Sequence, residues 1–222
     1  MNREVTSTIL AWLNSGKLPH PKNHTFITLI PKVKNPVLVF EYRPISLCNV
    51  LYKIFSKILL NILKKFMPEL ITEHQSAFAK NRPFLDNVLV AFETMHCMKN
   101  HNSGWTGFVT LKLDMSKAYD RVEWNYLQKL MEKMGFCTRW IGLIMACVRT
   151  VSHSILVNAD PKGLINPTQG IRQGDPLSPF LFLLGTEGLH GLITKAARAK
   201  EINGFSICKR GPKLTHLFFW RW

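Results

Sequence analysis

Residues 111–124 read LKLDMSKAYDRVEW and residues 171–180 read IRQGDPLSPF, and these two stretches decide how the chain is interpreted. Before Asp114 the sequence alternates apolar and polar side chains, as a strand with one buried face does. We therefore predict a strand over residues 108–114, with Asp114 on its polar face at its C-terminal end. The second stretch joins turn-forming Gly, Asp and Pro to a Ser-Pro pair, which is typical of the first turn of a helix. A strand that ends in a carboxylate, followed by a tight loop, suits metal-assisted phosphoryl chemistry.

Away from these stretches, the pattern predicts helices with few strands, in one continuous α/β or α+β domain. A short strand at residues 26–30 is expected before a polar, proline-broken loop over residues 32–43. Asn49 is a candidate N-cap for a helix that runs to about Lys65, with Pro68 ending that region. Further helices are predicted from near Asp86, over residues 124–134 with Gly135 as its C-cap, and over residues 138–149. A hairpin with its turn at residues 158–163 and a long helix from Ser178 are also predicted.

The first two predicted helices each carry apolar residues at helical spacing, which indicates a buried face. The predicted buried residues are Leu51, Ile54, Phe55, Ile58 and Ile62 in the first helix, and Val88, Ala91, Phe92 and Met95 in the second.

The charge of the chain predicts a polyanionic partner. Lys and Arg number 29 against 14 Asp and Glu, a net charge of +15, which favours nucleic acid or an anionic membrane surface. The five cysteines are odd in number and form no CxxC pair, so we expect buried thiols in a reducing compartment. No signal peptide and no stretch long enough to span a membrane is expected. We therefore expect an intracellular protein, with the nucleus as one candidate compartment.

The carboxylates alone leave the chemistry open. From periodicity, a helix cap or a solvated strand end is the favoured interpretation of Asp114. Asp120 is the rival metal ligand, but it follows the predicted strand. There it would support the start of the next helix or pair with Arg121 or Lys117.

Both stretches closely resemble motifs of reverse transcriptases, in particular those of LINE-type (non-LTR) retrotransposons of plants. In that family an aromatic residue follows the metal-binding aspartate by five positions, as Tyr119 follows Asp114 here. The resemblance implies that Asp114 is catalytic and binds Mg2+, and that Tyr119 packs on the sugar of the incoming nucleotide and excludes a 2′-hydroxyl. The alternative for Tyr119 is an ordinary half-buried core aromatic residue.

The family's second motif, Gln-Gly-x-x-x-Ser-Pro, begins here at Gln173 and Gly174. The resemblance implies that Gln173 binds near the nucleotide and that Gly174 lets the backbone approach it without a Cβ. The alternative is a plain strand-to-helix turn. Upstream, YRPISLCNVLYKIFSKIL resembles a fingers segment, in which Arg43 and Lys53 are candidates for gripping the triphosphate or the template. A solvated basic surface is an equal alternative for these two residues. A further fingers segment matches at Phe78, Arg82 and Asp86.

The resemblance implies an RNA-directed DNA polymerase with an RNA template, a DNA primer and deoxynucleotides as partners, and no membrane. Residues 26–107 are expected to be fingers-like. Residues 108–222 are expected to be an incomplete palm in which residues 108–114 pair with residues 214–219, with the thumb absent. The family continues this hairpin with aromatic-Ala-Asp-Asp, whereas residues 218–222 read FFWRW. We therefore expect a truncated domain that is inactive by itself. The alternative is a non-enzymatic, basic nucleic-acid-binding remnant.

Overall fold

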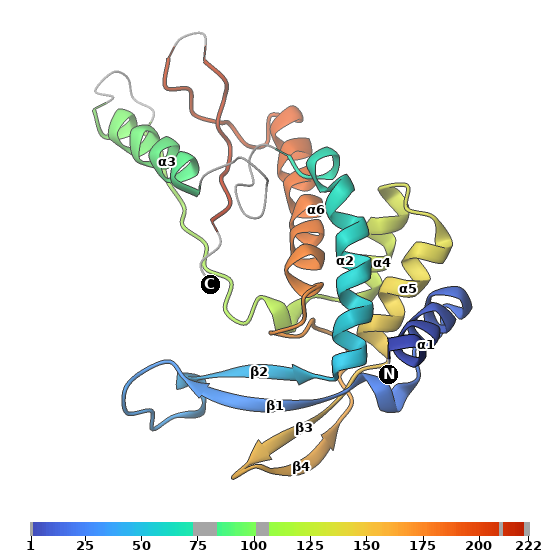
Figure 1. Ribbon diagram of the computed structural model, residues 1–222. Helices are drawn as coiled ribbons and strands as arrows, with labels where there is room; N and C mark the ends of the chain where they lie inside the picture. Colours follow the sequence, from blue (N-terminus) through green and yellow to red (C-terminus); the bar gives the residue numbers. More distant parts are fainter. Residues whose placement is uncertain (1, 73–83, 101–106, 209–210, 220–222) are drawn as a thin grey trace. The chain divides into compact units, whose positions relative to one another are not determined.

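The computed structural model describes residues 2–72, 84–100, 107–208 and 211–219. The chain divides into two compact units (Figure 1). Unit 1 comprises Met1–Lys65 with Lys117–Gly185, and unit 2 comprises Phe66–Ser116 with Thr186–Trp222. This division cuts across the predicted boundary near residue 107, because each unit draws on both sides of it. The assignment of fingers and palm stays a prediction.

Unit 1 contains a four-stranded sheet in the order β2-β1-β3-β4. Strand β1 pairs antiparallel with β2 and parallel with β3, while β3 and β4 form an antiparallel hairpin. The strands are β1 (His24–Pro31), β2 (Tyr42–Cys48), β3 (Ser152–Val157) and β4 (Asp160–Ile165).

The predicted strand at residues 26–30 and the predicted hairpin are both confirmed. The hairpin turn is tighter than expected, with Asn158 and Ala159 at φ +52° and +65°, as a two-residue turn of type I′ requires. Strand β2 was not predicted, because Pro44 lies inside it. As an edge strand, β2 tolerates a proline that a central strand would not.

Helices account for most of the remaining structure. They are α1 (Asn2–Ser15), α2 (Val50–Leu70), α3 (Phe84–Lys99), α4 (Trp124–Lys133), α5 (Thr138–Arg149) and α6 (Ser178–Arg198), with short 3-10 turns η1 (His20–Asn23), η2 (Val39–Glu41) and η3 (Tyr119–Arg121). Within unit 1, the sheet lies to one side of α1, α4 and α5 (Figure 1). None of the helices in the described residues is long and apolar enough to cross a membrane.

Local signals placed most helix ends correctly. The Asn49 side chain accepts a hydrogen bond from the Leu51 N–H at 2.9 Å, so the predicted N-cap of α2 is confirmed. After α4, Gly135 has φ +83° and the Phe136 N–H bonds back to the Met131 carbonyl at 3.1 Å, which is the geometry of a glycine C-cap. Helix α2 continues through Pro68 to Leu70, beyond its predicted end.

The buried face of α2 agrees with the prediction at Phe55, which is 1% exposed, but differs from it elsewhere, and so does the buried face of α3. In α2 the side chains of Tyr52, Leu59 and Leu63 are at most 1% exposed, whereas Ile54 and Ile62 are 38% and 39% exposed. Helix α2 carries apolar residues on more than one face, and tertiary packing selects which face is covered. In α3 the predicted core residues Val88, Phe92 and Met95 are exposed, while Asn87 and Thr94 are buried.

The predicted strand at residues 108–114 is wrong. Residues 107–115 form neither a helix nor a strand, and Val109, Leu111 and Leu113 are 89%, 75% and 79% exposed. Leu214 instead forms an isolated antiparallel bridge with Phe205. An alternating pattern becomes a strand only when a partner strand pairs with it, and the described part of unit 2 supplies none to this segment.

All five cysteines are free. Cys48 and Cys147 are buried as expected, but Cys137 and Cys208 are exposed, so the prediction of buried thiols is wrong for these two.

Candidate functional site

The end of the first sequence stretch, from Lys117 onward, meets the second stretch in unit 1 through the backbone. The Ile171 N–H donates to the Tyr119 carbonyl at 2.9 Å, and the Gly170 N–H donates to the Val122 carbonyl at 2.8 Å. The indole N–H of Trp124 donates to the Gly170 carbonyl at 2.7 Å. Gly170 has φ +91°, and a Cβ there would lie 3.1 Å from the carbonyl oxygen of Asp120. Close packing against η3 therefore explains a glycine at this position.

Tyr119 is held by η3 and by α6. Its half-buried ring stacks on the ring of Phe182, with centroids 5.1 Å apart and planes 10° from parallel. Burial raises the pKa of the Tyr119 phenol above its ordinary value, so the side chain stays neutral at physiological pH. The position of this aromatic ring is thus set by packing as well as by the backbone contact with Ile171.

Gln173 and Gly174 lie along the free edge of β2. The Ser46 N–H donates to the Gln173 carbonyl at 2.7 Å. Gly174 has φ +100°, and a Cβ there would lie 3.0 Å from the Ser46 carbonyl oxygen and 3.4 Å from the Ile45 side chain. The resemblance explained this glycine by close approach to the substrate. The structure gives it a second neighbour, the backbone of β2.

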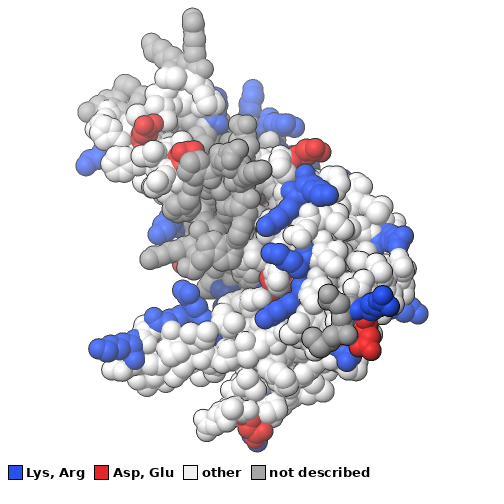
Figure 2. All heavy atoms as spheres, in the orientation of Figure 1, with Lys and Arg blue, Asp and Glu red and all other residues white. Residues whose placement is uncertain are grey.

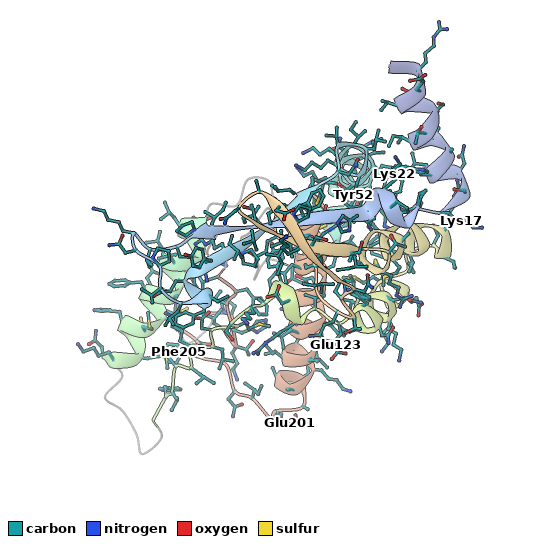
Figure 3. The ribbon with its side chains drawn as sticks, turned by 90° about the horizontal axis from the view of Figure 1, so that it is seen from below. Lys17, Lys22, Tyr52, Glu123, Glu201 and Phe205 are labelled. Carbon is teal, nitrogen blue, oxygen red and sulfur yellow. The ribbon has the colours of Figure 1, made fainter. Side chains whose placement is uncertain are left out.

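A buried ionic network beside this loop was missed by sequence reasoning. The Arg172 guanidinium donates to the Asp175 carboxylate at 2.9 Å, and both side chains are 5% exposed. The Tyr52 hydroxyl donates to the same carboxylate oxygen of Asp175, and the Arg172 guanidinium lies 3.9 Å from the Tyr52 ring centroid. Burial, with the charge of Asp175, raises the pKa of Tyr52 well above its ordinary value. Tyr52 lies on α2, and its side chain is labelled in Figure 3.

Sequence reasoning could have noted the opposite charges of Arg172 and Asp175, three positions apart in the loop. Nothing local could have identified their partners on η1, β1, α2 and α5. The remaining contacts of Arg172 are Asn23 Oδ1 at 2.7 Å, Thr25 Oγ1 at 3.0 Å and the Cys147 carbonyl at 3.4 Å.

Arg43 and Lys53 also belong to unit 1. Arg43 is exposed on β2, and Lys53 is exposed in the first turn of α2. Unit 1 therefore carries five of the six predicted site residues, and it brings Tyr119 next to the loop that holds Gln173 and Gly174.

Asp114 belongs to unit 2, where it is exposed. Among the described residues, no group of three or more His, Cys, Asp and Glu side chains could hold a metal ion. A pair of metal ions about 4 Å apart needs several carboxylate oxygens. The described carboxylates therefore do not by themselves fit a two-metal site.

Comparison with known families decides the class of protein. Residues 30–219 match the reverse transcriptase (RNA-dependent DNA polymerase) family, a span that includes both sequence stretches. The chain belongs to the reverse transcriptase family. Divalent metal ions, an RNA template and nucleotides are therefore the metal and substrate classes of its family.

Two of the curated relatives of this reverse transcriptase domain are proteins of transposable elements. It is 28% identical over 180 residues to the transposon TX1 uncharacterized 149 kDa protein of Xenopus laevis, covering 81% of this chain and 14% of that protein. It is 28% identical over 170 residues to the Pol polyprotein of the type-1 retrotransposable element R2 of Nasonia vitripennis, covering 75% of this chain and 16% of that one. Both relatives are named as products of transposable elements, so the domain is similar to the reverse transcriptases of such elements.

One plant relative covers a smaller part. An uncharacterized mitochondrial protein of Arabidopsis thaliana is 44% identical over 64 residues, covering 29% of this chain and 52% of that protein. The chain therefore spans about half of that relative, and much less of the TX1 and R2 proteins.

Proposed function

We propose that this chain forms the fingers and part of the palm of an RNA-directed DNA polymerase from a plant non-LTR retrotransposon. The observation that carries the proposal is the hydrogen bond between Ile171 and Tyr119, because it joins the Tyr119 end of the first polymerase motif to the second motif within unit 1. The natural partners would be an RNA template, a DNA primer and deoxynucleotides. Copying would take place inside the cell, with the nucleus as the candidate compartment.

The proposed roles of the site residues follow the family motifs. Tyr119 contacts the sugar of the incoming nucleotide, and Gln173 and Gly174 contact the nucleotide beside it. Arg43 and Lys53 contact the triphosphate or the template backbone. Their exposure is compatible with contact to a polyanion.

Asp114 is the proposed catalytic carboxylate and a ligand of Mg2+. The described carboxylates do not complete a metal site, so Asp114 would need carboxylates from outside the described residues. We propose that a polypeptide of these 222 residues does not polymerise by itself.

Primer extension on an RNA template tests these roles. The 222-residue polypeptide is compared with a version joined to the Ala-Asp-Asp hairpin and thumb of a relative. Only the joined version should extend the primer. Asp114→Ala should slow it roughly a thousandfold or more, since removing one metal ligand costs several kcal/mol of transition-state stabilisation. Asp160→Ala is the matched control, because Asp160 is an exposed carboxylate beside the β3–β4 turn. Full activity of the joined Asp114→Ala variant would refute the assignment.

The same joined enzyme tests Tyr119. Tyr119→Ala should let ribonucleotides be incorporated, since the ring that blocks the 2′-hydroxyl is gone. Unchanged discrimination between the two sugars would exclude this role.

A second candidate function is a non-enzymatic nucleic-acid-binding protein. The net charge of +15 favours it, and Lys and Arg side chains are spread over the visible surface with few Asp and Glu among them (Figure 2). Nucleic-acid binding without extension by the joined polypeptide would support this alternative.

A further inference from the structure

We propose that Tyr52, Arg172 and Asp175 are positioning residues: a buried brace that sets where Gln173 and Gly174 lie on the edge of β2. The brace would influence nucleotide binding without touching the nucleotide. Only this last consequence rests on the proposed function.

Burial divides the loop residues 172–175 into two kinds. The side chains of Arg172 and Asp175 are 5% exposed, whereas Gln173 is half-buried and Gly174 is exposed. The two charged residues thus anchor the loop from inside, and the two residues between them reach the surface. Neither Arg172 nor Asp175 is accessible to a template or a nucleotide. Their charges therefore stabilise the position of the loop through contacts inside the protein.

The two buried charged groups of the brace, on Arg172 and Asp175, have hydrogen-bond partners. Both nitrogen arms of the Arg172 guanidinium are used, and one of them bonds the Asp175 carboxylate. The second oxygen of that carboxylate accepts the Leu177 N–H at 3.0 Å, just before α6 begins. A buried ion pair is tolerated only when its remaining donors and acceptors find partners in this way. Its geometry is therefore specific, and a lysine could not reproduce the fork of contacts.

The contacts of the brace connect the segments that carry the proposed nucleotide-binding residues. Tyr52 directly precedes Lys53 on α2. Through the Arg172 side chain the loop is tied to β1, which pairs with β2, the strand of Arg43 and Ser46. Beyond these buried contacts, the hydrogen bond from the Ser46 N–H to the Gln173 carbonyl, at 2.7 Å, holds the loop on β2. Loosening the brace should release that hydrogen bond first.

Amide hydrogen exchange followed by NMR on the 222-residue chain tests this directly. The variants are Tyr52→Phe, which removes only the hydroxyl that donates to Asp175, and Arg172→Lys, which keeps the charge and loses the fork. In both, the Ser46 amide should exchange roughly tenfold faster or more, while the Ile144 amide in the core of α5 changes little. Tyr126→Phe is the matched control, because its hydroxyl donates to the Gly185 carbonyl at 2.7 Å, away from the loop.

Two results would overturn the brace. Unchanged exchange at Ser46 in Tyr52→Phe would show that the network does not hold the loop. Equal acceleration at Ser46 and Ile144 would show a general contribution to stability instead of positioning. If Arg172→Lys fails to fold, Tyr52→Phe still decides, since it leaves the aromatic ring in place.

The consequence for nucleotide binding needs a catalytic readout. In the polymerase joined to a relative's hairpin and thumb, Tyr52→Phe should raise the KM for deoxynucleotide roughly tenfold with little change in kcat. An unchanged KM would refute this consequence. Should the joined enzyme prove inactive, the proposed function fails, and the exchange measurement still decides whether the brace exists.

Discussion

The N–H of Ile171 donates to the carbonyl oxygen of Tyr119 at 2.9 Å, and this contact joins the two motifs that identify the family. This hydrogen bond holds the backbone of Ile171, the residue just before the buried Arg172. The aromatic residue and the Gln-Gly loop of the polymerase motifs are therefore parts of one backbone arrangement.

Gly174→Ala should lower the free energy of unfolding by about 1–3 kcal/mol, the usual cost of a side chain at a strongly positive φ. Gly174 has φ +100°, and the added Cβ would lie 3.0 Å from the Ser46 carbonyl oxygen. Gly142→Ala is the control, because Gly142 lies inside α5 and a Cβ added there would meet nothing within 4 Å. That change should be neutral or stabilising by up to about 1 kcal/mol. Urea denaturation compares the two, and equal effects would contradict the close approach to β2.

Arg172→Met should lower the free energy of unfolding by about 3–5 kcal/mol, because it leaves the Asp175 carboxylate buried without its ion-pair partner. The exposed Arg139 provides the matched control. Arg139→Met should change stability by less than about 0.5 kcal/mol. Chemical denaturation of both variants measures the difference. A loss below about 1 kcal/mol for Arg172→Met would show that Asp175 is solvated or satisfied without the arginine.

His153 should make the fold sensitive to acid. Burial, together with Arg172 and His24, lowers the pKa of His153 from 6.5 to about 4. Between these values the unfolded chain binds a proton that the folded chain does not, so stability rises with pH across this window. The fold therefore keeps this contribution above pH 6.5 and loses it as the pH falls toward 4.

The measurement is the unfolding free energy of the wild type and of His153→Gln across that pH range. The variant cannot titrate at this position, so the wild type should lose more stability on acidification than the variant does. Parallel pH curves would show that His153 already takes up its proton in the folded state.

Binding to single-stranded RNA should be weak, independent of sequence and strongly weakened by salt. The net charge of +15 supplies the attraction, and the slope of log affinity against log salt reflects about 0.7 per neutralised phosphate. Arg43→Gln and Lys53→Gln should each reduce this slope by up to that amount. Lys162→Gln is the control, because Lys162 already pairs with Asp160. Filter binding over a salt series gives the slopes, and binding unaffected by salt would rule out phosphate contacts.

Some of the architecture was predictable because its signals are local. The turn residues around Asn158, the cap at Asn49 and the glycine at Gly135 act on their own backbone, so the elements they bound were found nearly where they lie. The family motifs around Asp114 and Gln173 were equally readable, because they are contiguous strings.

The buried face of a helix and the pairing of a strand could not be predicted from such local signals. The sequence offered apolar residues on more than one side of α2, and packing chose the side of Tyr52 and Leu59. The alternation over residues 108–114 had no partner strand in the described residues, so the strand did not form there.

By itself, the sequence determined the family of this protein, the caps at Asn49 and Gly135 and the start of α6 at Ser178, since these depend on neighbouring residues. Only the tertiary structure showed which residues pair with the buried charges of Arg172 and Asp175, and which backbone lies close to Gly174. Those answers lie in Tyr52, Thr25 and Ser46, which are remote in sequence. A buried ion pair needs partners from several elements at once, and no local pattern specifies which elements will supply them.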